Sequence, residues 1–221
     1  MKRPFLAVLV ILLPFSLFSQ TKDFGIWYEA GASIPITRYL DFNLGGEIRT
    51  FEDASKINES FGEIGLSLKL LKWLSVAGNY RLTSKIEHQA GYFLRHKFMA
   101  DIKGKTNIGR FGLYCRFRFQ DQIRTYIKNP TDEDPDYYGR VKLEINYNIP
   151  KSHFEPVLYY EQFARMFRST EKTFDKYRLS AGLNYRISKK HRVGVAYIFQ
   201  RSYLPRLADI NILAVSYDFK L

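Results

Sequence analysis

Residues 177–187 read YRLSAGLNYRI, and every second side chain in this stretch is apolar. The apolar set is Tyr177, Leu179, Ala181, Leu183, Tyr185 and Ile187, and the side chains between them are charged, polar or small. A period of two is typical of a β-strand with one apolar and one polar face. The stretch therefore predicts a strand, and the same alternation recurs along most of the chain.

Eleven segments in all alternate in this way, and none shows helical periodicity over a useful length. They are residues 24–34, 40–49, 63–70, 74–83, 92–103, 110–120, 140–147, 154–161, 176–187, 193–199 and 211–221. Single-chain bacterial barrels normally have an even number of strands with both chain ends in the periplasm. The eleven segments therefore predict ten to twelve strands, with residues 24–34 as the segment whose role as a spanning strand is least secure.

The connections between these segments alternate in length. Residues 35–39, 71–73, 104–107, 150–153 and 188–191 are expected to be tight turns, and residues 52–59, 85–91, 121–137, 164–174 and 204–209 to be mostly longer, more polar loops. Short periplasmic turns with longer extracellular loops are typical of an outer-membrane barrel. A soluble meander would have less reason to separate the two lengths so regularly.

The polar faces indicate which side of the sheet meets solvent. Eight strands enclose an interior that side chains just fill, so a barrel of about ten strands with apolar faces inward would leave a void. Apolar faces turned outward to lipid remove this difficulty, and the sheet must then close because open edges do not persist in hydrocarbon. The sequence predicts an all-β, antiparallel transmembrane β-barrel, which a mean hydropathy of −0.28 permits.

The N-terminus has the pattern of a targeting segment. Lys2 and Arg3 precede an apolar run from Phe5 to Phe18, and the small residue Ser19 follows. This pattern predicts a signal peptide over residues 1–19 and a mature barrel over residues 20–221, with the net charge falling from +12 to +10. Export to the outer membrane of a Gram-negative bacterium excludes nucleic acid as a partner despite the basic charge.

The polar faces carry arginines and glutamates that we expect to line the lumen. The candidate network consists of Arg49, Arg116, Arg118, Arg140, Arg178, Glu47, Glu144 and Glu161. Such residues can fill a lumen as a network of ion pairs, since unpaired charges in a narrow interior are costly. The same arginines could instead attract anions or lipid phosphate. We favour the network, and we therefore expect a charge-lined, largely occluded lumen with a structural, binding or narrow-pore role.

Other chemistry is sparse. The four histidines lack metal-ligand spacing, so no metal and no cofactor are expected. The acidic residues 132–136 lack the glycine and terminal glutamate of a calcium loop. His96 and Ser84 share the lipid-facing register of neighbouring strands, which makes a lipid-modifying hydrolase an alternative, although no third catalytic residue is evident and no enzyme is proposed. A secreted soluble barrel that binds a small ligand is the other alternative.

Several short motifs together resemble a known family. They are Trp27, Glu47-Ile48-Arg49, Arg116-Phe117-Arg118-Phe119, the stretch 156–163 with Glu161, and Tyr177-Arg178 followed by Gly182 and Tyr185. With the signal peptide, they look like a family of small outer-membrane proteins known only as a domain of unknown function. The resemblance spans the mature chain and implies an outer-membrane barrel. It supplies no established activity and no catalytic residues.

The C-terminal segment resembles an assembly signal. Tyr217, Phe219 and Leu221 end an alternating, aromatic-rich stretch of the kind that the barrel-assembly machinery recognises. The expected partners are therefore this machinery and the lipid and lipopolysaccharide of the outer membrane, with the barrel itself a monomer.

Overall fold

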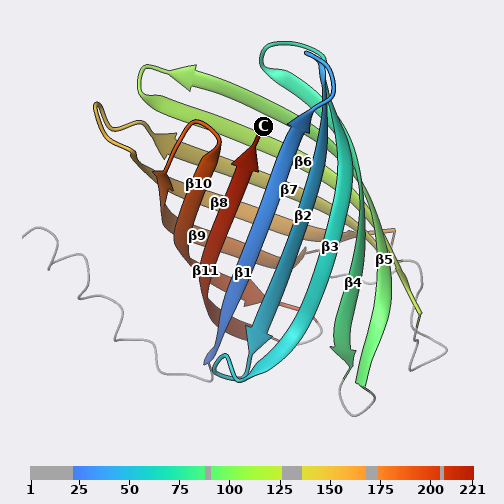
Figure 1. The fold of residues 1–221 in the computed structure, drawn as a ribbon. Helices are drawn as coiled ribbons and strands as arrows, with labels where there is room; N and C mark the ends of the chain where they lie inside the picture. The colour runs from blue at the N-terminus through green and yellow to red at the C-terminus, as the bar shows by residue number, and fades with distance from the viewer. Residues whose placement is uncertain (1–21, 88–90, 126–135, 168–173, 205–206) are drawn as a thin grey trace, which may run out of the picture.

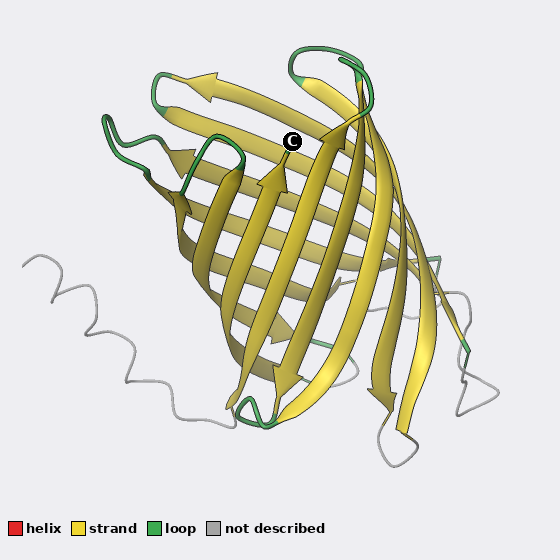
Figure 2. Ribbon diagram, viewed as in Figure 1, coloured by secondary structure: helices red, strands yellow, loops and turns green. Residues whose placement is uncertain are grey.

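The chain forms a closed barrel of eleven strands (Figures 1 and 2). The computed structural model describes residues 22–87, 91–125, 136–167, 174–204 and 207–221, so the predicted signal peptide lies outside the described residues. The strands are β1 (Lys22–Pro35), β2 (Leu40–Phe51), β3 (Lys56–Lys69), β4 (Leu74–Glu87), β5 (Gly91–Ile108), β6 (Phe111–Arg124), β7 (Asp136–Tyr147), β8 (Phe154–Met166), β9 (Phe174–Arg186), β10 (His191–Ser202) and β11 (Ala208–Lys220). Within the described ranges, no helix is long and apolar enough to cross a membrane. The all-β barrel predicted from the alternation is confirmed.

The barrel closes through one parallel pair of strands. β1 pairs with β11 in parallel, with Tyr28 opposite Val215, and every other neighbouring pair is antiparallel. The expectation of an even strand number is therefore wrong for this chain. A parallel seam lets an odd number of strands close without leaving an unpaired edge. As a result, β1 starts at one end of the barrel and β11 finishes at the other (Figure 1).

The two ends of the barrel differ in their connections. We call the end with residues 36–39, 70–73, 109–110, 148–153 and 187–190 the short-turn end, and the end with residues 52–55, 88–90, 125–135, 167–173 and 203–207 the long-loop end. Two connections expected to be long are short, because β3 begins at Lys56 and β4 extends to Glu87. Residues 104–107 lie within β5, and the turn comes at Gly109, whose φ of 59° suits glycine.

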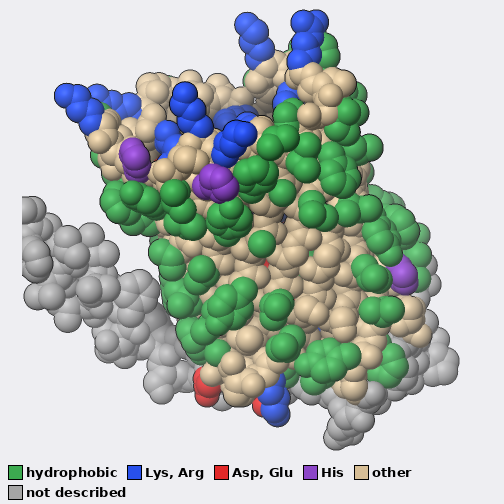
Figure 3. Space-filling view, viewed as in Figure 1, with side chains coloured by type: hydrophobic (Ala, Val, Ile, Leu, Met, Phe, Trp, Pro, Cys, Tyr) green, Lys and Arg blue, Asp and Glu red, His purple; other side chains and the backbone are tan. Residues whose placement is uncertain are grey.

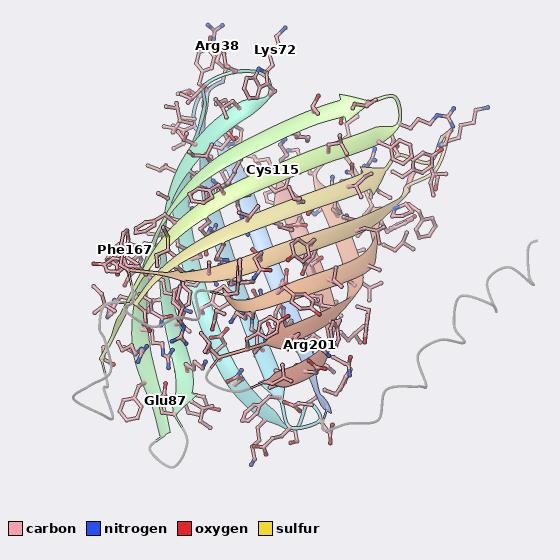
Figure 4. The ribbon with its side chains drawn as sticks, turned by 180° about the vertical axis from the view of Figure 1, so that it is seen from behind. Arg38, Lys72, Glu87, Cys115, Phe167 and Arg201 are labelled. Carbon is pink, nitrogen blue, oxygen red and sulfur yellow. The ribbon has the colours of Figure 1, made fainter. Side chains whose placement is uncertain are left out.

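The faces of the strands are arranged opposite to those of a soluble barrel. Large apolar side chains cover the outside, where Leu66 is 48% exposed and Leu183 is 38% exposed. Charged side chains are buried inside, where Asp101 is 2% exposed and Glu161 is 3% exposed. Apolar side chains accordingly spread over the outer wall between the two rims, whereas lysine and arginine gather at the short-turn rim (Figure 3). Arg38 and Lys72 project from that rim, and Glu87 lies at the opposite end (Figure 4).

One part of the inner wall is apolar. Trp27 from β1 packs with Ile198 from β10 and with Ile212 and Ala214 from β11, and all four are buried. β10 and β11 are thus apolar on both faces where they flank the parallel seam. The charged side chains of the lumen come mainly from the remaining strands.

Candidate functional site

The lumen contains a cavity at each end, and both are lined by basic side chains. The cavity at the long-loop end has a volume of about 310 Å³, and we call it the long-loop chamber. The cavity at the short-turn end has a volume of about 510 Å³, and we call it the short-turn chamber. The cationic lining of the first is Arg49, Arg81, Lys85, Arg95, Lys97, Arg140, Lys176 and Arg178, against Glu59 and Asp175. That of the second is Lys103, Arg116, Arg118, Arg186, Lys189, Lys190, Arg192 and Lys220, against Glu63 and Asp218.

Glu161 lies between the two chambers. Its Oε1 accepts hydrogen bonds from Nη2 of Arg116 at 2.7 Å and from Nη2 of Arg140 at 2.8 Å. Its Oε2 lies 3.5 Å from Nη1 of Arg178. Arg116 lines the short-turn chamber, whereas Arg140 and Arg178 line the long-loop chamber. One carboxylate therefore joins cations that face opposite ends of the barrel.

A second ion pair bridges the chambers in the same way. Nε of Arg81 donates to Oε2 of Glu63 at 2.7 Å, and the two residues line different chambers. Arg49 adds hydrogen bonds of 2.5 Å to both Glu47 and Glu59. We call this set the arginine layer; it comprises Arg49, Arg81, Arg116, Arg140 and Arg178 with Glu47, Glu59, Glu63 and Glu161. It crosses the lumen between the two cavities.

Aromatic rings support the arginine layer. The guanidinium groups of Arg49 and Arg178 lie 4.0 Å and 4.6 Å from the ring centre of Trp27. Arg140 lies 4.4 Å from the ring centre of Phe163, and Arg81 lies 3.7 Å from that of Phe61. Planar guanidinium groups stack on aromatic faces while their edges bond to carboxylates. These contacts fix the planes of the guanidinium groups.

The arginine layer contains five guanidinium groups and four carboxylates, and the carboxylate of Glu29 interacts electrostatically with Arg49 and Arg178 beside them. Among the described residues, the buried Nε atoms of Arg116 and Arg140 have no hydrogen-bond acceptor. Glu161 alone faces three arginines. A buried donor without an acceptor is costly, and an excess of buried positive charge attracts anions.

The other two residues of the predicted network have different partners. Arg118 binds Asp101 through two hydrogen bonds, of 2.6 Å and 2.7 Å, and both side chains are buried. Glu144 pairs instead with Lys142, at 2.7 Å. Asp101 stands on the polar face of its strand in the sequence, yet the alternation pattern did not identify it as a partner. The alternation pattern also gave no reason to single out Lys85, Lys97 and Lys176. It shows which side chains share a face of a strand, and it does not show which side chains from different strands lie together.

The predicted assembly residues lie at the short-turn end. Tyr217 is hydrogen-bonded through its hydroxyl to Nδ1 of His191 at 2.7 Å, and the ring centre of Phe219 lies 5.1 Å from that of His191. The backbone N–H of Leu221 donates to the carbonyl of Ser33 at 3.1 Å. The last residues of the chain thus help to hold β11 against both β10 and β1.

The residues considered for catalysis are not brought together as a catalytic pair. Nδ1 of His96 is 2.8 Å from the hydroxyl of Tyr80, and the structure records no hydrogen bond from His96 to Ser84. In the β4–β5 register, Ser84 is opposite Leu94, and His96 is opposite Leu82. Within the described parts of the chain, no cluster of three or more His, Cys, Asp or Glu side chains could hold a metal ion.

Comparison with known proteins places this architecture in a family. A solved structure described as the NanC porin matches with a TM-score of 0.54 at 12% sequence identity, covering 80% of this chain and 86% of that chain. The likeness concerns the fold of the barrel. No curated protein matches the sequence. The family described as "Protein of unknown function (DUF2490)" matches residues 24–209, and the chain belongs to this family.

Proposed function

We propose that the protein is an outer-membrane β-barrel whose lumen is a constricted passage for small anions. The observation that carries the proposal is the arginine layer together with the two chambers that it separates, in each of which lysines and arginines outnumber the carboxylates. The apolar outer wall and the likeness to a porin structure support the membrane location.

The charge distribution supports a preference for anions. A cation that enters from either end meets a chamber with an excess of lysine and arginine, so its local concentration is low. An anion is concentrated there and then meets the guanidinium groups of Arg116 and Arg140, whose Nε atoms have no acceptor among the described residues. Because those groups are also stacked and ion-paired, the passage is narrow, and the current through the unmodified protein is small.

The proposal includes the route and orientation of the barrel. Residues 1–19 direct export as a cleaved signal peptide, the barrel-assembly machinery inserts the chain as a monomer, and lipid and lipopolysaccharide surround the apolar wall. The short-turn end faces the periplasm, and the long-loop end faces outward.

Cysteine labelling on intact cells tests the orientation. Cys115 is the single cysteine and is replaced by serine first. Ser55→Cys, at the long-loop end, is then expected to react with a membrane-impermeant maleimide, and Lys189→Cys, at the short-turn end, to react only after lysis. Labelling of Lys189→Cys alone on intact cells would show the opposite orientation.

Ion currents test the passage itself. The wild-type protein in a planar bilayer is expected to show little steady conductance, and a salt gradient is expected to give a reversal potential of the sign for anions. A large, stable current would show that the arginine layer does not close the lumen. A reversal potential of the sign for cations would contradict the proposed selectivity.

A further inference from the structure

The long-loop chamber contains three lysines that the ion pairs of the lumen do not use. Lys85 from β4, Lys97 from β5 and Lys176 from β9 line this chamber. Among the described residues, none of the three ammonium groups has a hydrogen bond or an ion pair within 4.0 Å. The Nζ atom of Lys176 lies 4.9 Å from the ring centre of Phe163.

The arginines of the same chamber differ from these lysines. Arg49 binds Glu47 and Glu59, Arg81 binds Glu63, Arg95 binds Glu87, and Arg140 and Arg178 share Glu161. Asp175, which also lines the chamber and interacts electrostatically with Lys176, lies 3.4 Å from Nε of Arg165. The local carboxylates are therefore already engaged by arginines. Glu59 interacts electrostatically with all three lysines, but its oxygen lies 2.5 Å from Nη1 of Arg49.

Burial makes this imbalance costly. Lys97 is only 9% exposed, and the other two lysines are half-buried. Positive charges removed from bulk water need a partner or retained water, and a cavity with three such charges is stabilised by a counter-ion. The space exists, since the cavity volume of about 310 Å³ far exceeds the roughly 10–15 Å³ that a single water molecule needs.

From these observations we propose that the long-loop chamber is a binding site for a small multivalent oxyanion, namely phosphate or a small phosphate ester, held by Lys85, Lys97 and Lys176. Each ammonium group offers three donors and acts as a compact point charge, which suits a tetrahedral oxyanion. The side-chain amides of Gln120 and Gln122, both buried in the chamber wall, offer neutral donors beside them. The arginine layer below supplies further positive potential.

The site deepens the proposed function, because it rests on the same polar lumen and names the kind of anion that the passage takes up. Anion binding and ion flow are nevertheless separate observables. A saturable site can exist in a lumen that does not conduct, and a conducting lumen can lack a site.

Calorimetry with inorganic phosphate tests the proposal on the full-length protein, folded in a phosphate-free maltoside detergent at constant ionic strength. The wild type is expected to bind phosphate saturably and to unfold at a higher temperature when phosphate is present than when chloride replaces it. Lys97→Met is expected to raise the Kd for phosphate at least tenfold, and the triple substitution at Lys85, Lys97 and Lys176 to abolish binding.

The control is Lys105→Met, because Lys105 lies on the same strand, β5, near the short-turn end and does not line this chamber. It is expected to bind phosphate like the wild type. Absence of saturable binding to the wild type would overturn the proposal, as would unchanged binding by a folded triple variant. Anion-selective currents without phosphate binding would refute the proposed phosphate site and leave the proposed anion passage standing. Phosphate binding without any current would refute the passage and leave the site standing.

Discussion

Replacement of Glu161 by glutamine is the sharpest perturbation of the arginine layer. The substitution Glu161→Gln keeps the size and shape of the side chain and removes its charge. The three arginines that now surround the carboxylate would then face a neutral amide inside the lumen. We expect both the stability and the conductance of the barrel to change.

The contacts of Glu161 set the size of the effect. Two short hydrogen bonds, from Arg116 and Arg140, join charged partners, and such bonds contribute about 1.5–3 kcal/mol each. Glutamine retains one neutral acceptor oxygen, so part of this stabilisation remains. The third arginine, Arg178, is 3.5 Å away and adds less. The free energy of unfolding is therefore expected to fall by about 3 kcal/mol, near the lower end of the range for breaking a buried ion pair.

Urea unfolding of the folded barrel in detergent measures this change, with Glu144→Gln as the matched control. Glu144 pairs with Lys142, and the side chains of Glu144 and Lys142 are 26% and 20% exposed, so the replacement of Glu144 is expected to cost about 1 kcal/mol or less. In planar bilayers, Glu161→Gln is expected to increase the anion-selective current, whereas the control should conduct like the wild type. Equal unfolding midpoints and equal currents for the two variants would refute the role assigned to Glu161.

A charge added to the outer face of the barrel is expected to hinder folding into bilayers far more than a charge added to the lumen face. Leu66→Arg places a charge on the lipid face, and Ser67→Arg places one on the lumen face. The free energy of folding into bilayers is expected to be about 2–4 kcal/mol less favourable for Leu66→Arg than for Ser67→Arg. Folding yields with the reverse ranking would show that the apolar face points inward. Deletion of residues 217–221 is expected to abolish outer-membrane insertion, because it removes both the assembly signal and part of the β1–β11 seam. Phe219→Ala leaves the β1–β11 pairing intact, so a loss of insertion for this variant as well would assign the effect to the assembly signal. Normal insertion of the truncated chain would show that neither the assembly signal nor this part of the β1–β11 pairing is needed.

The sequence predicts the barrel wall well because alternation is a local property. All eleven predicted segments are strands, and their apolar faces point outward. Strand ends are predicted less well: residues 104–107 were expected to be a turn but lie within β5. Here charged residues such as Lys103 and Lys105 extend the alternation beyond the apolar segment, so composition alone does not indicate where the strand ends.

The closure of the barrel could not be predicted, because the pairing of β1 with β11 joins opposite ends of the chain. Nothing in residues 24–34 indicates a parallel partner. The sequence does contain a related signal in β10 and β11, where Ile198 and Ile212 occupy the lumen face. Apolar residues on both faces of a strand mark the place where Trp27 of β1 packs.

The candidate site was predictable in its residue types and not in its partners. Arginine and glutamate on the polar faces indicate a charged lumen, but the tilt and register of the strands decide which side chains meet. Glu161 meets three arginines from β6, β7 and β9, whereas Glu144 meets a lysine two residues away on its own strand. That Lys85, Lys97 and Lys176 in the long-loop chamber lack a carboxylate partner can be seen only once each neighbouring carboxylate has been assigned to an arginine.

Quenching of tryptophan fluorescence by brominated lipids tests most directly the central claim, that the apolar wall faces lipid and the polar wall faces the lumen. The protein contains two tryptophans, of which Trp27 is 6% exposed on the lumen face and Trp73 is 56% exposed in a turn. In vesicles with brominated acyl chains, Trp73→Phe is expected to leave the emission of Trp27 unquenched. A variant that combines Trp73→Phe, Trp27→Phe and Leu183→Trp has a single tryptophan, at position 183. Its emission is expected to be strongly quenched, because Leu183 lies on the outer wall. Quenching of Trp27 together with an unquenched Leu183→Trp variant would contradict the account.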